Sequence, residues 1–320
     1  MQANDFAKLL EDTEVEIVER GSRVGILGMT SVTAALVRQL SGAGLRTAIR
    51  GVFAPKHVES LEFTVEVRAL EELLDEELDA LVVASDEDKE TLIEAALPYI
   101  GGAPKLIVAG YGHLAFRDEV FRDLEANLLV PSIANGYPNC LVHIYQCLAN
   151  AARLGLEGSV VEFGTFKGGT AAFLGSAVRR LKTKWPVVSF DTFTGFPPRR
   201  SPLDMYDQPN CVFTDVEAVR NYTGRLGVKL VEGDIVDTAK QLQDTDIVLT
   251  FVDTDNYSSA RAALDVVIDR TVVGGAIIFD HFTGVDRFRY TLGERFAAKR
   301  VLDDSRYFNL HGTGVFTRQC

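Results

Sequence analysis

The sequence has no apolar run long enough to span a bilayer. Its opening segment, MQANDFAKLLEDTEVEIVER, is acidic and polar and lacks the apolar core of a secretory signal. These absences favour a cytoplasmic protein that does not enter a membrane. Basic residues are also in the minority, with 33 lysines and arginines against 45 acidic residues and a formal net charge of -12. Such a chain repels a phosphate backbone, so we expect no nucleic-acid partner.

Cysteine is scarce as well. The cysteines have neither CxxC spacing nor a nearby histidine cluster of the kind that metal and redox sites show; they are Cys140, Cys147, Cys211 and Cys320. Because cytosolic thiols are normally reduced, we interpret all of them as buried or incidental thiols. With 47% hydrophobic and 24% charged residues, the composition is that of a folded globular protein.

The 320 residues exceed the usual size of one domain, and the hydrophobic pattern forms two series of strands and helices. In the first series, the short apolar runs RVGILG, TAIRGVF, DALVVAS and KLIVAG predict strands. In the second, SVVEFG, VVSFD, VKLVEGD, IVLTFVD and GGAIIFD predict five parallel strands, and RYFNLHGTGVFTRQC predicts a terminal hairpin. The expected fold is therefore α/β, with a C-terminal Rossmann-like sheet preceded by a smaller Rossmann-type α/β domain.

The segment 114–153 interrupts this strand rhythm with a turn-rich stretch, PSIANGYPN, between two helical patterns. We place the domain boundary here and expect a first domain over residues 1–130 and a second over residues 131–320. In the first domain, Gly25 and Gly28 follow a strand, but the full GxGxxG pattern and a ribose-binding acid are absent. A structural role, such as dimerisation or substrate enclosure, is the alternative to dinucleotide binding. We expect a homo-oligomer.

The second domain has a glycine turn in VEFGTFKGGTA, where small residues allow a strand-to-helix turn to approach a ligand closely. The next strand ends at Asp191, about 20 residues beyond the turn, where an acid can bind ribose hydroxyls or cap the following turn. The third strand ends near Asp234, which is placed to contact an adenine edge. Together these strand ends predict a nucleoside site.

The fourth and fifth strands end at Asp253 and Asp280. Adjacent strands lie about 5 Å apart, so the two carboxylates are placed to share one cation. A divalent ion there would bind a substrate hydroxyl, lower its pKa and orient its oxygen. Asp255, two residues after Asp253, is expected to cap the helix that begins near Ser258.

The segments VEFGTFKGGTA, DTFTGFP, VEGD, FVDTDNYSSARAAL and GGAIIFDHF resemble the macrocin O-methyltransferase family from about Ser132 to the C-terminus. This resemblance implies S-adenosylmethionine, a class I methyltransferase sheet and Mg²⁺. It implies metal ligands at Asp253, Asp280 and His281, which are also the expected catalytic residues. It assigns the cofactor contacts to Glu162, Gly164, Thr165, Gly168, Gly169, Asp191, Thr192, Phe193 and Asp234.

His281 departs from the family, whose members commonly have Asp or Asn at this position. Mg²⁺ prefers oxygen ligands, whereas imidazole better suits Mn²⁺, Fe²⁺, Ni²⁺ or Zn²⁺. His281 is therefore a metal ligand, a general base oriented by Asp280, or a residue with only a structural hydrogen bond. The long loop over residues 194–211 is expected to cover the substrate, with Arg199 and Arg200 either contacting an anion or lying on the surface.

The main hypothesis is methyl transfer from S-adenosylmethionine to a hydroxyl of a small natural product, such as a sugar or another polyol. One alternative makes the first domain an NAD-binding oxidoreductase module fused to the methyltransferase. Another treats the chain as a ligand-sensing or scaffold protein that keeps the fold without turnover. Cofactor binding and methyl-transfer assays distinguish the three.

Overall fold

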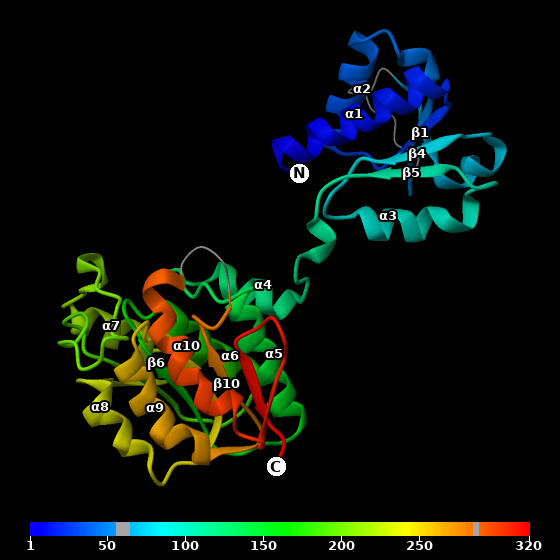
Figure 1. The fold of residues 1–320 in the computed structure, drawn as a ribbon. Helices are drawn as coiled ribbons and strands as arrows, with labels where there is room; N and C mark the ends of the chain where they lie inside the picture. Colours follow the sequence, from blue (N-terminus) through cyan, green and yellow to red (C-terminus); the bar gives the residue numbers. More distant parts are fainter. Residues whose placement is uncertain (56–64, 284–287) are drawn as a thin grey trace. The chain divides into compact units, whose positions relative to one another are not determined.

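The computed structural model describes residues 1–55, 65–283 and 288–320. They form two compact units, Met1–Phe116 and Arg117–Cys320, and each unit has its own β-sheet with flanking helices (Figure 1). The expected α/β fold with two sheets is confirmed. Within the described ranges, no helix is both long enough and apolar enough to cross a bilayer.

The first unit is built on a five-stranded parallel sheet with the order β3-β2-β1-β4-β5. All residues of β1 and β4 are buried, as expected for central parallel strands covered on both faces. The elements of this unit are α1 (Ala3–Arg20), β1 (Val24–Leu27), α2 (Ser31–Gly42), η1 (Arg46–Ala48), β2 (Ile49–Ala54), β3 (Val67–Ala69), η2 (Leu70–Asp75), β4 (Ala80–Val83), α3 (Lys89–Ala96), η3 (Leu97–Tyr99), β5 (Lys105–Val108) and η4 (Gly112–Leu114).

The second unit begins earlier than the sequence indicates. We expected the boundary between residues 130 and 131, but the division falls between Phe116 and Arg117. The reason is helix α4 (Glu119–Ala126), whose Phe121 ring lies 5.7 Å from the ring of Tyr145 and 5.8 Å from that of Phe173. Because these aromatic contacts join α4 to the helices that carry Tyr145 and Phe173, α4 belongs to the second unit.

The second unit has a seven-stranded sheet with the order β11-β12-β10-β9-β6-β7-β8. The five expected parallel strands are confirmed as β6 to β10. The expected hairpin is confirmed as β11 and β12, and β12 lies antiparallel to β10 (Figure 1). Its remaining elements are α5 (Cys140–Arg153), β6 (Ser159–Phe163), α6 (Gly169–Arg180), β7 (Val187–Asp191), η5 (Pro209–Cys211), α7 (Val216–Gly224), β8 (Val228–Glu232), α8 (Ile235–Thr238), η6 (Ala239–Leu242), β9 (Ile247–Val252), α9 (Tyr257–Arg270), β10 (Thr271–Phe279), α10 (Phe288–Leu302), β11 (Tyr307–Asn309) and β12 (Val315–Arg318).

Backbone hydrogen bonds continue between the strands just past their carboxyl ends. The amides of Gly164, Asp253 and Asp280 each donate a 2.9 Å bond to the neighbouring strand, to the carbonyls of Phe190, Phe163 and Val252 respectively. The strand ends that carry the candidate residues are therefore aligned with one another. This alignment places the candidate residues along one edge of the sheet, where parallel α/β proteins bind their ligands.

Candidate active site

The glycine turn follows β6 and leads into α6. Gly164 and Gly168 have positive φ angles of 99° and 83°. A Cβ at Gly164 would lie 1.9 Å from the carbonyl oxygen of Asp253, and one at Gly169 would lie 2.4 Å from the carbonyl oxygen of Pro131. Glycine is therefore required at positions 164 and 169 because the protein's own backbone passes close by. The sequence had suggested a different reason, the close approach of a ligand.

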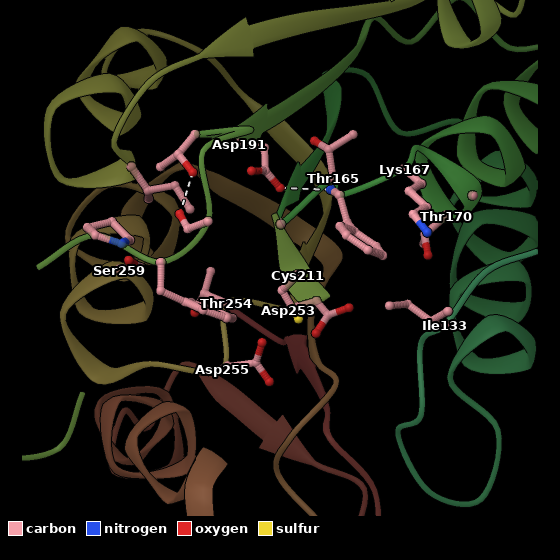
Figure 2. Close-up of a pocket in the computed structure, with 18 of the residues that line it drawn as sticks. Ile133, Thr165, Lys167, Thr170, Asp191, Cys211, Asp253, Thr254, Asp255 and Ser259 are labelled. Carbon is pink, nitrogen blue, oxygen red and sulfur yellow. Dashed lines mark hydrogen bonds between the residues drawn. The ribbon is translucent and has the colours of Figure 1, made fainter. Parts of the chain in front are cut away.

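A pocket opens beside this turn (Figure 2). Six of the expected site residues line it, namely Gly164, Thr165, Gly169, Asp191, Thr192 and Asp253. Asp253 and Asp255 lie close to Cys211 in this pocket, and Lys167, Thr170 and Ile133 lie along one side of it (Figure 2). Cys211 is free and half-buried, so this thiol, interpreted from the sequence as incidental, is part of the pocket wall.

The other expected residues do not belong to the pocket lining, among the residues described. They are Glu162, Gly168, Phe193, Asp234, Asp280 and His281. Gly168 precedes α6 and packs against α7, because a Cβ there would lie 2.8 Å from Cγ2 of Thr223. Phe193 is only 2% exposed and has a φ of 56°. These two residues shape the turns around the pocket from within the protein.

Asp191 caps the turn after its strand and also lines the pocket. Its Oδ1 accepts a 2.8 Å bond from the amide of Phe193, which caps the turn after β7. Its Oδ2 accepts a 2.7 Å bond from the amide of Phe166 in the glycine turn, as the dashed line in Figure 2 shows. A carboxylate has about four acceptor positions, so Asp191 retains capacity for hydroxyl groups of a ligand in the pocket.

Glu162 lies on β6, just before the glycine turn, and is fully buried. Its Oε2 accepts the hydroxyl of Ser189, whose oxygen lies 2.6 Å from Oγ1 of Thr165. Its Oε1 is buried without a hydrogen-bond partner among the described residues. Burial raises the pKa of Glu162 to about 8. The unpartnered oxygen is thus held close to the glycine turn.

Three side chains at the ends of β9 and β10 meet beside the pocket. Nε2 of His281 lies 3.5 Å from Oδ1 of Asp253 and 3.4 Å from Oδ2 of Asp280. One potential ligand atom from each of these residues lies within 4.8 Å of the others. Oδ1 of Asp280 accepts 2.7 Å bonds from the amides of Asn135 and Gly136, whereas its buried Oδ2 has no hydrogen-bond partner among the described residues. The arrangement can hold one cation.

Electrostatics couple these groups. Burial raises the pKa of the Asp253 carboxyl far above its ordinary value, and the neighbouring Asp280 raises it further. Burial would lower the pKa of His281, but hydrogen bonds to Asp253 and Asp255 outweigh it and raise that pKa to about 12. A cluster of carboxylates that strongly favours positive charge at its centre suits either an imidazolium or a metal ion.

Asp255 has a role that the sequence analysis missed. We expected it to cap the following helix, but α9 begins at Tyr257 after Asn256, and the amide of Ser258 donates instead to Asp204 at 2.8 Å. Asp255 has a φ of 58°, lines the pocket, and places its Oδ1 2.9 Å from Nε2 of His281. The Asp-x-Asp spacing in FVDTDNY was the available signal.

Glu294 on α10 was also missed, although it lies among the active-site loops. It is fully buried, and burial raises its pKa to about 7. Thr291, Ala298 and Val301, spaced by one and two turns from it, are buried on the same helix. A glutamate within this buried stripe was the available signal.

The loop over residues 194–211 is fixed to the helices beside it. Asp204 is 5% exposed and accepts bonds from the amides of Arg200 and Ser201, both at 2.9 Å, as well as from Ser258. Tyr206 and the side chain of Asn256 exchange two 2.9 Å bonds. Nη1 of Arg200 lies 2.8 Å from Oδ2 of Asp234, so Arg200 pairs with an acid of the protein.

In the first unit, the turn after β1 is packed against side chains of the same unit. A Cβ at Gly28 would lie 2.8 Å from Cδ1 of Leu92. The hydroxyl of Thr30 donates a 2.7 Å bond to the carbonyl of Ala84, which joins the turn after β1 to the residue after β4. These contacts lie at the point where a dinucleotide would cross the sheet. They favour the structural interpretation of this unit.

Comparisons with known proteins identify a family for the second unit. The macrocin-O-methyltransferase (TylF) family model matches residues 138–319, which is more than half of the chain. None of the curated proteins compared with the chain matches it.

Three of the similar solved structures are methyltransferases. The O-methyltransferase NovP is 20% identical over 56% of this chain and 78% of its own, with a TM-score of 0.44. The calicheamicin methyltransferase CalS11 is 19% identical over 68% of this chain and 98% of its own, with a TM-score of 0.41. The O-methyltransferase from Bacillus cereus in complex with SAH is 15% identical over 63% of this chain and 90% of its own, with a TM-score of 0.38.

Because these identities and TM-scores are low, the assignment depends on the family match and on the motifs that it covers. Those motifs supply the glycine turn, Asp191 and the Asp253 loop that line the pocket. The chain belongs to the macrocin-O-methyltransferase (TylF) family and is an S-adenosylmethionine-dependent O-methyltransferase.

Proposed function

We propose that this protein methylates a hydroxyl of a small natural product, such as a sugar, with the help of a divalent metal ion. The observation that carries the proposal is the cluster of Asp253, Asp255, Asp280 and His281 beside the pocket that the glycine turn lines. It brings a candidate cation site and an acid that lines the pocket close to the expected methyl-donor site.

The methyl donor is assigned to the side of the pocket next to the glycine turn. Asp191 retains acceptor capacity for ribose hydroxyls, and the unpartnered Oε1 of Glu162 is a candidate acceptor for the donor's ammonium group. Asp234, which pairs with Arg200, is assigned a contact with the adenine edge. We assign direct contacts to the pocket-lining residues Gly164, Thr165, Gly169 and Thr192, and a shaping role to Gly168 and Phe193.

The donor set of the cluster fits a divalent metal ion. Asp253 and Asp280 offer carboxylate oxygens, His281 offers Nε2, and Oδ2 of Asp280 is a buried acceptor without a hydrogen-bond partner among the described residues. One imidazole with two carboxylates suits Mn²⁺, Fe²⁺ or Zn²⁺ better than Mg²⁺. A bound ion of this kind would supply Lewis acidity that lowers the pKa of the acceptor hydroxyl.

The proton of the acceptor hydroxyl needs a base. Asp255 lines the pocket and is therefore assigned this role. S-adenosylmethionine bound beside the glycine turn would supply the methyl group for the acceptor oxygen, and the Asp255 carboxylate would take the hydroxyl proton. Nε2 of His281 faces Asp253, Asp255 and Asp280, so as a metal ligand it would not also accept the proton.

The pocket combines aromatic and apolar groups with a cation in its lining. Phe166, Phe196 and Ile133 line it, together with Lys167. Nζ of Lys167 lies 5.0 Å from the centroid of the Phe166 ring. Apolar walls with a few polar groups are typical of sites for small organic molecules. This lining supports an acceptor with a ring and several hydroxyls.

The proposal is tested with methyl-labelled S-adenosylmethionine and a panel of acceptors that includes macrocin, other glycosylated natural products and simple phenols. We expect label in a sugar-bearing acceptor, loss of transfer after chelation, and recovery with Mn²⁺. Full transfer after exhaustive chelation would contradict the metal assignment. Binding of S-adenosylmethionine without methylation of any acceptor in the panel would favour the ligand-sensing alternative.

A further inference from the structure

Glu294 on α10 joins the two loops that carry the acidic cluster. Its Oε2 accepts bonds from the amides of Thr254 at 2.8 Å and Asp255 at 3.0 Å. Its Oε1 accepts a 3.0 Å bond from the amide of His281. The first loop follows β9 and carries Asp253 and Asp255, and the second follows β10 and carries Asp280 and His281. A single side chain is therefore bonded to both loops.

The chemistry of these contacts requires a carboxylate. Two consecutive amides point at one oxygen, and the turn that allows this has Asp255 at a φ of 58°. Such pairs of consecutive amides form a concave anion site, and the Glu294 side chain fills it. The third amide points at the other oxygen, so both oxygens must act as acceptors. A glutamine would turn its NH₂ group toward at least one amide donor and lose that hydrogen bond.

The position of Glu294 also sets distances within the cluster. Its two oxygens hold the backbone of Asp255 and the backbone of His281, and the side chains of these residues meet at 2.9 Å. Glu294 is fully buried and does not line the pocket, so a substrate in the pocket would not contact it. Any influence on methyl transfer must act through the residues that it holds.

We propose that Glu294 is a positioning residue of this methyltransferase, which sets the separation between the Asp253–Asp255 loop and the Asp280–His281 loop. The contribution of Glu294 to catalysis rests on the proposed function of the cluster, whereas its effect on the position of His281 does not. Removing a residue that orients metal ligands from behind typically weakens metal binding by roughly 10- to 100-fold.

The experiment compares the wild-type protein with Glu294→Gln, using Val301→Ala as a matched control. Val301 is fully buried on the same helix and has no assigned role in the site, so its truncation tests general destabilisation of α10. The chain has five histidines, so the imidazole resonance of His281 can be assigned in a ¹⁵N-histidine NMR spectrum from its loss in His281→Asn. All spectra are recorded at the same pH and at a temperature well below the unfolding temperature of every variant.

We expect Glu294→Gln to shift the His281 imidazole resonance and to weaken Mn²⁺ binding by roughly 10- to 100-fold, whereas Val301→Ala changes neither. Glu294→Asp serves if the first variant does not fold, because its shorter carboxylate retains the charge but cannot reach both loops. An unchanged His281 resonance in the glutamate variants, or an equal shift in Val301→Ala, would overturn the proposal. Titration of the wild-type protein with S-adenosylhomocysteine separates the two proposals: if it does not bind, the proposed function fails, whereas the His281 resonance still decides the role of Glu294.

Discussion

Nε2 of His281 lies 2.9 Å from Oδ1 of Asp255, at the centre of a group that also contains Asp253 and Asp280. The family to which this chain belongs was expected to have Asp or Asn at position 281. As a metal ligand, the imidazole would offer nitrogen in place of oxygen, and its Nε2 contacts Asp255.

Replacing His281 by Asp tests the choice of metal. We expect the wild-type protein to bind Mn²⁺ more tightly than Mg²⁺, because imidazole is a better ligand for the former. In His281→Asp the Mn²⁺-to-Mg²⁺ affinity ratio should fall by roughly tenfold or more. Calorimetric titration of the chelated protein in the presence of S-adenosylhomocysteine measures both affinities. Equal ratios in the two proteins would show that His281 is not a ligand.

Replacing Asp255 by Asn tests the assigned base. The amide is similar in shape but cannot accept the hydroxyl proton, so the rate of methyl transfer should fall about 10²- to 10⁴-fold. S-adenosylhomocysteine affinity should stay within a few-fold of the wild-type value, because Asp191 and the glycine turn are unchanged. An assay with labelled methyl groups measures the transfer rate, and calorimetry measures the S-adenosylhomocysteine affinity. A variant with nearly full activity would remove Asp255 from the mechanism.

Glu162 makes the stability of the cofactor-free protein depend on pH. Its folded-state pKa of about 8 lies above the ordinary value of 4.5, so between these values the folded protein holds a proton that the unfolded chain has released. Stability from this group is greatest below about pH 4.5 and is lost as the pH rises toward 8, by up to about 1.4 kcal/mol per pH unit.

Glu162→Gln removes this titration, so urea unfolding should show the variant gaining stability relative to the wild type between pH 5 and pH 8. The same variant should bind S-adenosylhomocysteine more weakly, because the carboxylate assigned to the ammonium group is gone. Comparing the two proteins at each pH cancels the contribution of other titrating groups. A stability difference that does not change with pH would contradict the assigned pKa.

Asp204 is expected to hold the loop over the pocket. Asp204→Ala leaves the amides of the half-buried Ser201 and Ser258 without this acceptor and should cost about 1–3 kcal/mol of unfolding free energy. Trypsin should then cleave after Arg199 or Arg200 faster than in the wild type, since the loop is released. Asp207→Ala, an exposed position in the same loop, is the control. Equal cleavage rates in the two variants would show that Asp204 does not hold the loop.

Much of the second unit could be predicted from its sequence. Strands of the sheet interior have mostly apolar sequences, and each is followed by the glycine or acid that the motifs mark, such as Gly164 and Asp253. The first unit was less predictable. Helix α1 was missed because its buried face consists of only Leu9, Thr13, Glu16 and Ile17, two of which are polar. Strand β3 was also missed, because it is only three residues long.

The roles of Asp255, Glu294 and Arg200 depend on contacts between segments far apart in the chain. Glu294 bonds to amides 39 and 40 residues before it, and Asp234 pairs with an arginine of the preceding loop. Local sequence pattern carries no information on such partners, because it records only which face of a helix or strand is apolar. The early start of the second unit has the same origin, since it depends on the packing of Phe121 against Tyr145 and Phe173.

The central claim is that the pocket beside the glycine turn binds S-adenosylmethionine next to a metal site. Its most direct test is calorimetric titration of the purified protein with S-adenosylhomocysteine, repeated after chelation and after addition of Mn²⁺ or Mg²⁺, for the wild type and Asp191→Asn. We expect one molecule to bind per chain, with affinity lowered about 10- to 100-fold in the variant, and a separate heat for Mn²⁺ that is lost in Asp253→Ala. No binding by the wild type, or equal binding by the variant, would contradict the account.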